Sequence, residues 1–229
     1  MTSLCILGDS IAKGVVFNEQ KQKYIFAPES FDKLIAKKTG AAVRNWAKFG
    51  CTIDKGLSIL EKVKAELTDY KSCLLEFGGN DCDLNWSEIS ENPKAPHLAK
   101  VPLDDFKNKY GKIIGEIKKS GVRPIVLTLP PLEPNRFFNW ISKGLSKHNI
   151  MEYLNFDVQS IYDWHEMYNR TVIEVAENNE IDIINISSAF LTLGDYSEYL
   201  CIDGMHPNEA GHKIIAEHCK SVLHQLGIF

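Results

Sequence analysis

Short apolar runs that alternate with longer amphipathic stretches constrain the fold of this chain more than any other feature. Near-continuous apolar runs are typical of strands that are buried on both faces, as they are in a parallel sheet. The stretches between them place apolar residues at helical spacing, as Leu57, Leu60 and Val63 do. The alternation predicts the α/β class, with a mostly parallel five-stranded sheet. The runs occupy 4–7, 42–47, 72–77, 124–129 and 181–186.

Two segments interrupt this alternation. Residues 82–104 contain several prolines, and residues 130–165 are rich in aromatic side chains. Because long connections in compact domains are often functional, we expect long loops at about 82–104 and 130–165 that shape a substrate site. The spacing near the chain end predicts a last helix from Pro207 to about Leu226. No Gly-, Ser- or Pro-rich linker interrupts the chain, so we expect one domain over 1–229.

Composition and charge exclude several classes of protein. The chain has 229 residues, 44% hydrophobic and 24% charged, which is typical of a soluble globular protein. Its net charge is -4 and its basic residues are scattered, which argues against nucleic acid as the main partner. Six cysteines without C-x-x-C spacing argue against a zinc knuckle or a dithiol redox site. With neither a secretory pattern nor a run of about 20 apolar residues, we expect a cytoplasmic protein without a membrane span. The oligomeric state stays open.

Polar residues follow the predicted strands at the points where ligands bind in parallel α/β sheets. Such ligands lie beyond the carboxyl ends of the strands. Ser10 follows the first strand, Gly50 the second and Asn80 the third. Asp203 and His206 come after the last strand. We therefore expect these residues to meet at one edge of the sheet.

These residue types suit nucleophilic catalysis. A serine hydroxyl becomes a good nucleophile when an imidazole takes its proton and an acceptor orients the imidazole. The short spacing of Asp203 and His206 lets the carboxylate reach one ring nitrogen while the other faces Ser10. The backbone N–H groups of Ser10 and Gly50 and the side-chain amide of Asn80 are candidate donors to an oxyanion.

Each residue also has a structural alternative. Ser10 is a suitable turn or helix N-cap residue, and Asn80 belongs to a tight-turn sequence. Asp203 is a suitable cap for the helix that follows His206. The combination on one predicted edge favours catalysis over these separate structural roles.

Four sequence blocks resemble those of the GDSL or SGNH hydrolases. Gly8-Asp9-Ser10 is similar to the first block of that family and Gly50 to its second. Gly78-Gly79-Asn80-Asp81 is similar to the third block, and Asp203-Gly204-Met205-His206 to the last. The blocks occur in the family's order and span nearly the whole chain.

The resemblance implies a fold and a mechanism. The fold is a flavodoxin-like three-layer α/β/α sandwich. The implied mechanism uses no metal or cofactor and passes through an acyl-enzyme. It assigns Ser10 as nucleophile, His206 as general base and Asp203 as the partner of His206. It also assigns Gly50 and Asn80 to the oxyanion hole, beside the N–H of Ser10.

The substrate implied by the resemblance is a small-molecule ester. Short acyl esters, including O-acetyl groups on carbohydrate, are the first choice, while thioesters and lysophospholipids stay open. An ordinary α/β-hydrolase is a competing interpretation, but its nucleophile elbow normally follows an internal strand. A non-catalytic module that binds a ligand in the same cleft also stays open. A nucleotide-binding domain is disfavoured because the chain lacks a Gly-rich phosphate loop.

Overall fold

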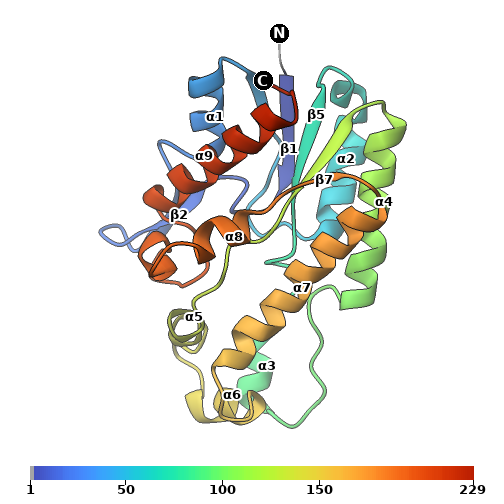
Figure 1. The fold of residues 1–229 in the computed structure, drawn as a ribbon. Helices are drawn as coiled ribbons and strands as arrows, with labels where there is room; N and C mark the ends of the chain where they lie inside the picture. The colour runs from blue at the N-terminus through green and yellow to red at the C-terminus, as the bar shows by residue number, and fades with distance from the viewer. Residues whose placement is uncertain (1–2) are drawn as a thin grey trace.

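A parallel five-stranded sheet runs through the centre of the computed structural model, which describes residues 3–229 (Figure 1). Its spatial order is β4-β1-β5-β6-β7, and all neighbouring strands are parallel. The predicted α/β class and the five predicted strands are confirmed. Residues 1 and 2, which the expected domain over 1–229 includes, lie outside the described part. The strands are β1 (Ser3–Gly8), β4 (Ala42–Asn45), β5 (Ser72–Glu76), β6 (Arg123–Leu127) and β7 (Asp182–Ile184).

Helices cover both faces of this sheet, as Figure 1 shows. Alternate residues of β1 enter two different cores, with Cys5 and Leu7 on one face and Leu4 and Ile6 on the other. The predicted three-layer sandwich is confirmed. Among the helices of residues 3–229, none combines the length and apolar character that crossing a bilayer requires. The first face packs on α2 (Ile53–Leu67), α4 (Leu103–Lys119) and α7 (Gln159–Asn178). The second packs on α1 (Phe31–Thr39), α8 (Ile186–Leu191) and α9 (Glu209–Gln225).

The two segments expected as long loops carry short helices instead. Local signals start each one: the side chains of Asn85, Glu133 and Ser146 accept N–H groups of the first turns. Their apolar residues share a small core of their own, which includes Ile89 and Ile150. Each helix is short, and the core that stabilises it joins segments that are distant in the sequence, so the local pattern did not reveal it. The helices are α3 (Trp86–Glu91), α5 (Pro134–Ile141) and α6 (Lys147–Tyr153), followed by the start of α7.

The last helix begins two residues later than the predicted Pro207, at Glu209. Asn208 is the reason: its Oδ1 accepts the N–H groups of Ala210 and Gly211 at 2.9 and 3.0 Å. Its Nδ2 donates to the carbonyl of Glu198 at 2.8 Å, just before the turn that holds the last sequence block. The cap therefore fixes where that turn ends.

An antiparallel hairpin that the sequence analysis did not predict follows β1. It consists of β2 (Val15–Asn18) and β3 (Lys23–Phe26). Its first strand is tied to the Ser10 loop, because the N–H of Val15 donates to the carbonyl of Ser10 at 2.9 Å. Its other contacts reach the far end of the chain, where the N–H of Phe17 lies 3.3 Å from Cys201 Sγ. The hairpin thus contacts both the Ser10 loop, near the start of the chain, and the segment at Cys201, near its end.

A buried carboxyl at the start of α2 makes stability depend on pH. Asp81 Oδ1 accepts the N–H of Ile53 at 2.8 Å, while Asp81 Oδ2 is buried without a partner in residues 3–229. Burial raises the pKa of Asp81 from its ordinary 3.8 to about 7. The folded chain therefore holds this proton more tightly than the unfolded chain, and the free energy of unfolding falls as pH rises from about 4 to 7.

We expect Asp81→Asn to weaken this pH dependence. Chemical denaturation at pH 4.5 and pH 8 measures the free energy of unfolding of both proteins. The loss between these pH values is smaller in the variant by roughly 1–3 kcal/mol, because the amide never ionises. Equal losses in both proteins would contradict the assignment.

Candidate active site

Ser10, His206 and Asp203 form a continuous line of hydrogen bonds at the carboxyl edge of the sheet. His206 Nε2 lies 2.8 Å from Ser10 Oγ, and His206 Nδ1 lies 2.7 Å from Asp203 Oδ2. The three residues are 4%, 2% and 0% exposed, so water does not compete for these bonds. A carboxylate at Nδ1 favours the tautomer in which Nε2 accepts the serine proton. The arrangement can therefore take a proton from Ser10.

The turn that carries Asp203 and His206 is built by its own first side chain. Asp203 Oδ1 accepts the N–H groups of Met205 and His206, both at 3.0 Å. Gly204 has a φ of +72°, and a Cβ there would lie 2.6 Å from the carbonyl oxygen of Glu133. A side chain at 204 would therefore push this turn away from the start of α5.

Asp203 has a fourth donor that sequence reasoning missed. The hydroxyl of Tyr24, on the hairpin, donates to Asp203 Oδ2 at 2.9 Å. Burial alone would raise the pKa of Asp203, but hydrogen bonds from the ring and backbone of His206 and from Met205 hold it below its ordinary value. Asp203 is therefore an ionised carboxylate. Two short apolar runs, 15–17 and 24–26, separated by polar residues, were the sequence signal for the hairpin, and they gave no sign of its partner.

Asn80 is held beside the Ser10 loop by Asp9. Asn80 Nδ2 donates to Asp9 Oδ2 at 2.9 Å, and Asp9 Oδ1 accepts the N–H of Ile11 at 2.8 Å. One carboxylate therefore ties the end of β5 to the turn that contains Ser10. An amide nitrogen has two hydrogens, so the contact with Asp9 leaves one free for another acceptor.

Asp9 forms a buried pair of carboxyls with Glu76. Both residues are almost completely buried, and Glu76 Oε2 accepts the N–H of Ala12 at 3.2 Å. Burial and the adjacent Asp9 charge raise the pKa of Glu76 well above its usual range. Glu76 therefore keeps its proton, while Asp9 accepts from the side chain of Asn80 and the N–H of Ile11.

Gly50 lies in the turn after β4, directly after Phe49, whose ring contacts the imidazole of the site. It has a φ of +65°, and the space that a Cβ would enter is open for 4 Å. The ring of its neighbour Phe49 stacks on His206, with the centroids 6.3 Å apart. The structure thus brings Ser10, Asp203 and His206 into direct contact. Asn80 is bonded to Asp9, the neighbour of Ser10, and Gly50 follows Phe49, which stacks on His206.

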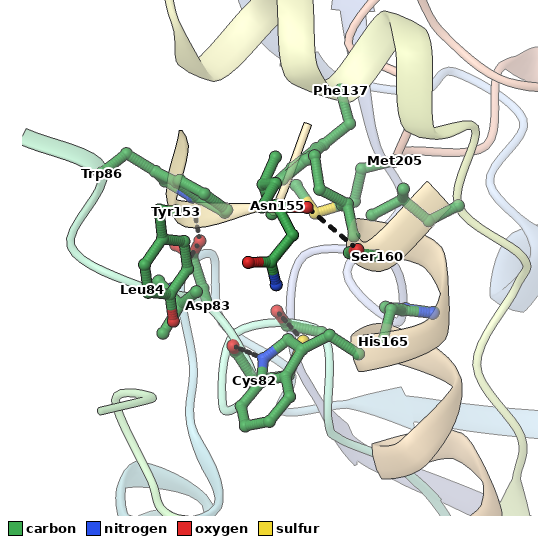
Figure 2. Close-up of a pocket in the computed structure, with 15 residues that line it drawn as sticks. Cys82, Asp83, Leu84, Trp86, Phe137, Tyr153, Asn155, Ser160, His165 and Met205 are labelled. Carbon is green, nitrogen blue, oxygen red and sulfur yellow. Dashed lines mark hydrogen bonds between the residues drawn. The ribbon is translucent and has the colours of Figure 1, made fainter. Parts of the chain in front are cut away.

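An apolar pocket of about 280 Å³ adjoins this group. Its lining includes Gly79, which precedes Asn80, and Met205, which precedes His206. Figure 2 shows Trp86 and Tyr153 on one side of the pocket and Met205 and His165 on the other. The walls come from α3, α5, α6 and α7, so the segments expected to shape a substrate site do line a cavity.

The pocket offers little charge to a ligand. Asp83, its only acidic lining residue, is paired with Lys100 at 2.7 Å and accepts the indole N–H of Trp86 at 3.0 Å. Burial lowers the pKa of His165 to about 4, so this imidazole is neutral at pH 7. The pocket therefore suits an uncharged, largely apolar group.

Comparison with known proteins places the chain in a family. Residues 6–214 match the model of the GDSL-like lipase/acylhydrolase family. A rice (Oryza sativa subsp. japonica) GDSL esterase/lipase, WDL1, is 22% identical over 194 residues. That match covers 83% of this chain and 67% of the plant protein.

Solved structures share the fold. The lipase/acylhydrolase from Enterococcus faecalis superposes with a TM-score of 0.70 at 17% identity, covering 98% of this chain and 96% of that one. An acetyl-xylooligosaccharide esterase from Geobacillus has a TM-score of 0.65 at 20% identity, covering 99% and 94%. The chain therefore belongs to the GDSL-like lipase/acylhydrolase family, and its reaction class is the hydrolysis of carboxylic esters.

Proposed function

We propose that the chain hydrolyses acyl esters with Ser10 as nucleophile, His206 as general base and Asp203 as the partner of His206. The observation that carries this assignment is the unbroken line of hydrogen bonds from Ser10 Oγ to Asp203, at 2.8 and 2.7 Å. These separations lie within the range that proton transfer between a nucleophile and its base requires.

The reaction runs in two halves. Ser10 Oγ attacks the ester carbonyl while His206 Nε2 takes the hydroxyl proton. The tetrahedral intermediate then expels the alcohol, which takes that proton from His206, and leaves an acyl group on Ser10. Water activated by His206 attacks this acyl-enzyme, and the acid leaves as Ser10 regains its proton. Asp203 stays ionised throughout and stabilises the transient imidazolium.

The oxyanion of the intermediate is stabilised by the N–H groups of Ser10 and Gly50 and the side-chain amide of Asn80. The contact between Asn80 and Asp9 supports this role, because it fixes the amide before substrate arrives. Donors held in advance stabilise developing charge without the cost of reorganising them during the reaction.

Short-chain acyl esters, including O-acetyl groups on carbohydrate, are our first choice of substrate. The acetyl-xylooligosaccharide esterase of similar fold supports this choice. An acetyl group needs little room beside Ser10, which is only 4% exposed.

A second candidate, an ester or thioester with a longer acyl chain, is favoured by the apolar pocket. A cavity of about 150 Å³ is enough to bind benzene. The pocket beside Gly79 and Met205 measures about 280 Å³, far more than an acetyl group fills. Each buried methylene contributes about 0.8 kcal/mol, which corresponds to roughly a fourfold gain in kcat/KM per carbon.

Ser10→Ala is expected to abolish both ester turnover and labelling by a fluorophosphonate probe. The variant lacks the only hydroxyl within reach of His206 Nε2 in residues 3–229, and it should fold normally, since it loses a single buried oxygen. Ser58→Ala, on the exposed surface of α2, is the matched control and should react like the native protein. Full labelling of the Ser10→Ala protein would refute the assignment.

Asn80→Ala should reduce kcat by roughly 10²–10³ and change KM little, because an oxyanion donor acts mainly in the transition state. Steady-state kinetics with an aryl acetate measures this change. Thermal denaturation controls for the lost contact with Asp9. An unchanged kcat would remove Asn80 from the oxyanion hole.

A series of p-nitrophenyl esters from acetyl to decanoyl separates the two substrate candidates. If acetyl esters are preferred, kcat/KM falls steadily with chain length. If the pocket takes the acyl chain, kcat/KM rises to a maximum at medium length. In that case Ser160→Phe, which places a ring in the pocket, lowers turnover of octanoyl esters at least tenfold and leaves acetyl esters as an internal control.

A further inference from the structure

We propose that Tyr24 is a positioning residue for catalysis, which fixes the orientation and basicity of Asp203 through a hydroxyl-to-carboxylate hydrogen bond. This inference rests on the proposed function of Ser10, His206 and Asp203. Tyr24 is then a fourth residue in the chain of hydrogen bonds from Ser10 to Asp203. It lies outside the four sequence blocks that resemble those of the family.

The contact is direct and shares its acceptor atom with the imidazole. Tyr24 OH donates to Asp203 Oδ2 at 2.9 Å, and His206 Nδ1 lies 2.7 Å from the same oxygen. Asp203 is 0% exposed, so water does not replace either donor. Burial and then the charge of Asp203 raise the pKa of Tyr24, so its hydroxyl keeps the proton that it donates. At neutral pH the hydroxyl is therefore a donor and the carboxylate an acceptor.

The ring of Tyr24 also contacts the imidazole. The centroids of Tyr24 and His206 are 5.0 Å apart, and those of Tyr24 and Phe49 are 5.4 Å apart. Phe17, opposite Tyr24 in the hairpin register, packs edge-on against it at 5.2 Å. These aromatic contacts restrict the rotation of the Tyr24 ring, so its hydroxyl is already oriented toward Asp203.

The hairpin that carries Tyr24 is anchored at both ends of the proposed site. Next to the nucleophile, the N–H of Val15 donates to the carbonyl of Ser10 at 2.9 Å. Next to the carboxylate, Val16 and Ala27 pack in one cluster with Cys201, two residues before Asp203. A rigid link between these two loops is what a positioning group needs.

The hydroxyl has a definite electrostatic effect. A donor to Asp203 withdraws part of the negative charge that stabilises the imidazolium of His206. Without it, the carboxylate holds the imidazolium more strongly, and the base is released only at higher pH. The other ionisable groups around the pair are Asp9, Cys201 and His212, and a change at Tyr24 leaves all three in place.

Tyr24→Phe tests the proposal because it removes the hydroxyl and keeps the ring contacts. We expect kcat to fall about tenfold with KM nearly unchanged, since one hydrogen bond to a charged group is lost. We also expect the acidic limb of the kcat/KM profile to move up by roughly half a pH unit. Tyr168→Phe is the matched control: its buried hydroxyl bonds the carbonyl of Val101 at 2.8 Å, away from the site.

A double-mutant cycle with Asp203→Asn makes the test specific. If Tyr24 acts through Asp203, Tyr24→Phe has little further effect on kcat in the Asp203→Asn background. Multiplicative losses, or a Tyr24→Phe profile that matches the native one, would overturn the proposal. Those results would refute the role of Tyr24 but not the assignment of Ser10 as nucleophile. Ester turnover by Ser10→Ala would refute the proposed function itself, so the two failures are distinguishable.

Discussion

Burial of both sheet faces is the constraint on which the rest of this structure depends. Helices pack on both faces of the parallel sheet, so the polar side chains of the site lie at its edge and not on its faces. The carboxyl ends of the strands all open onto one of those edges, where loops supply backbone donors. Ser10, Asn80 and Asp203 lie there for this reason, although they are distant in sequence.

Four buried carboxyls at this edge illustrate how hydrogen bonding decides ionisation. Asp203 accepts from two backbone N–H groups, an imidazole and a tyrosine, and its pKa is lowered despite complete burial. Asp81 accepts from the backbone N–H of Ile53, and burial raises its pKa to about 7. Glu76 is kept protonated beside Asp9. Only the carboxylate with a full set of donors is suited to serve an imidazole as a permanent negative charge.

The short helices beyond the sheet edge add an apolar pocket to the site. In Figure 1, α3, α5 and α6 gather at one end of the molecule, away from the two chain termini. Their shared core is separate from the two cores of the sandwich, and it leaves an apolar pocket next to Gly79 and Met205. The proposed catalytic residues therefore lie at the sheet edge, whereas the walls of the pocket come mainly from the added helices.

Sequence alone determined the sheet, its class and the set of residues at its edge. Strand periodicity and the polar residues that follow each strand are local signals, and they predicted that Ser10, Gly50, Asn80, Asp203 and His206 lie at this edge. The contact between Tyr24 and Asp203 joins residues 179 positions apart and was decided by the tertiary structure. The short helices within 130–165 were likewise missed, because they are stabilised by a small core that forms only when distant segments pack together. Periodicity reports which face of an element is buried, but it does not report which distant partner covers that face.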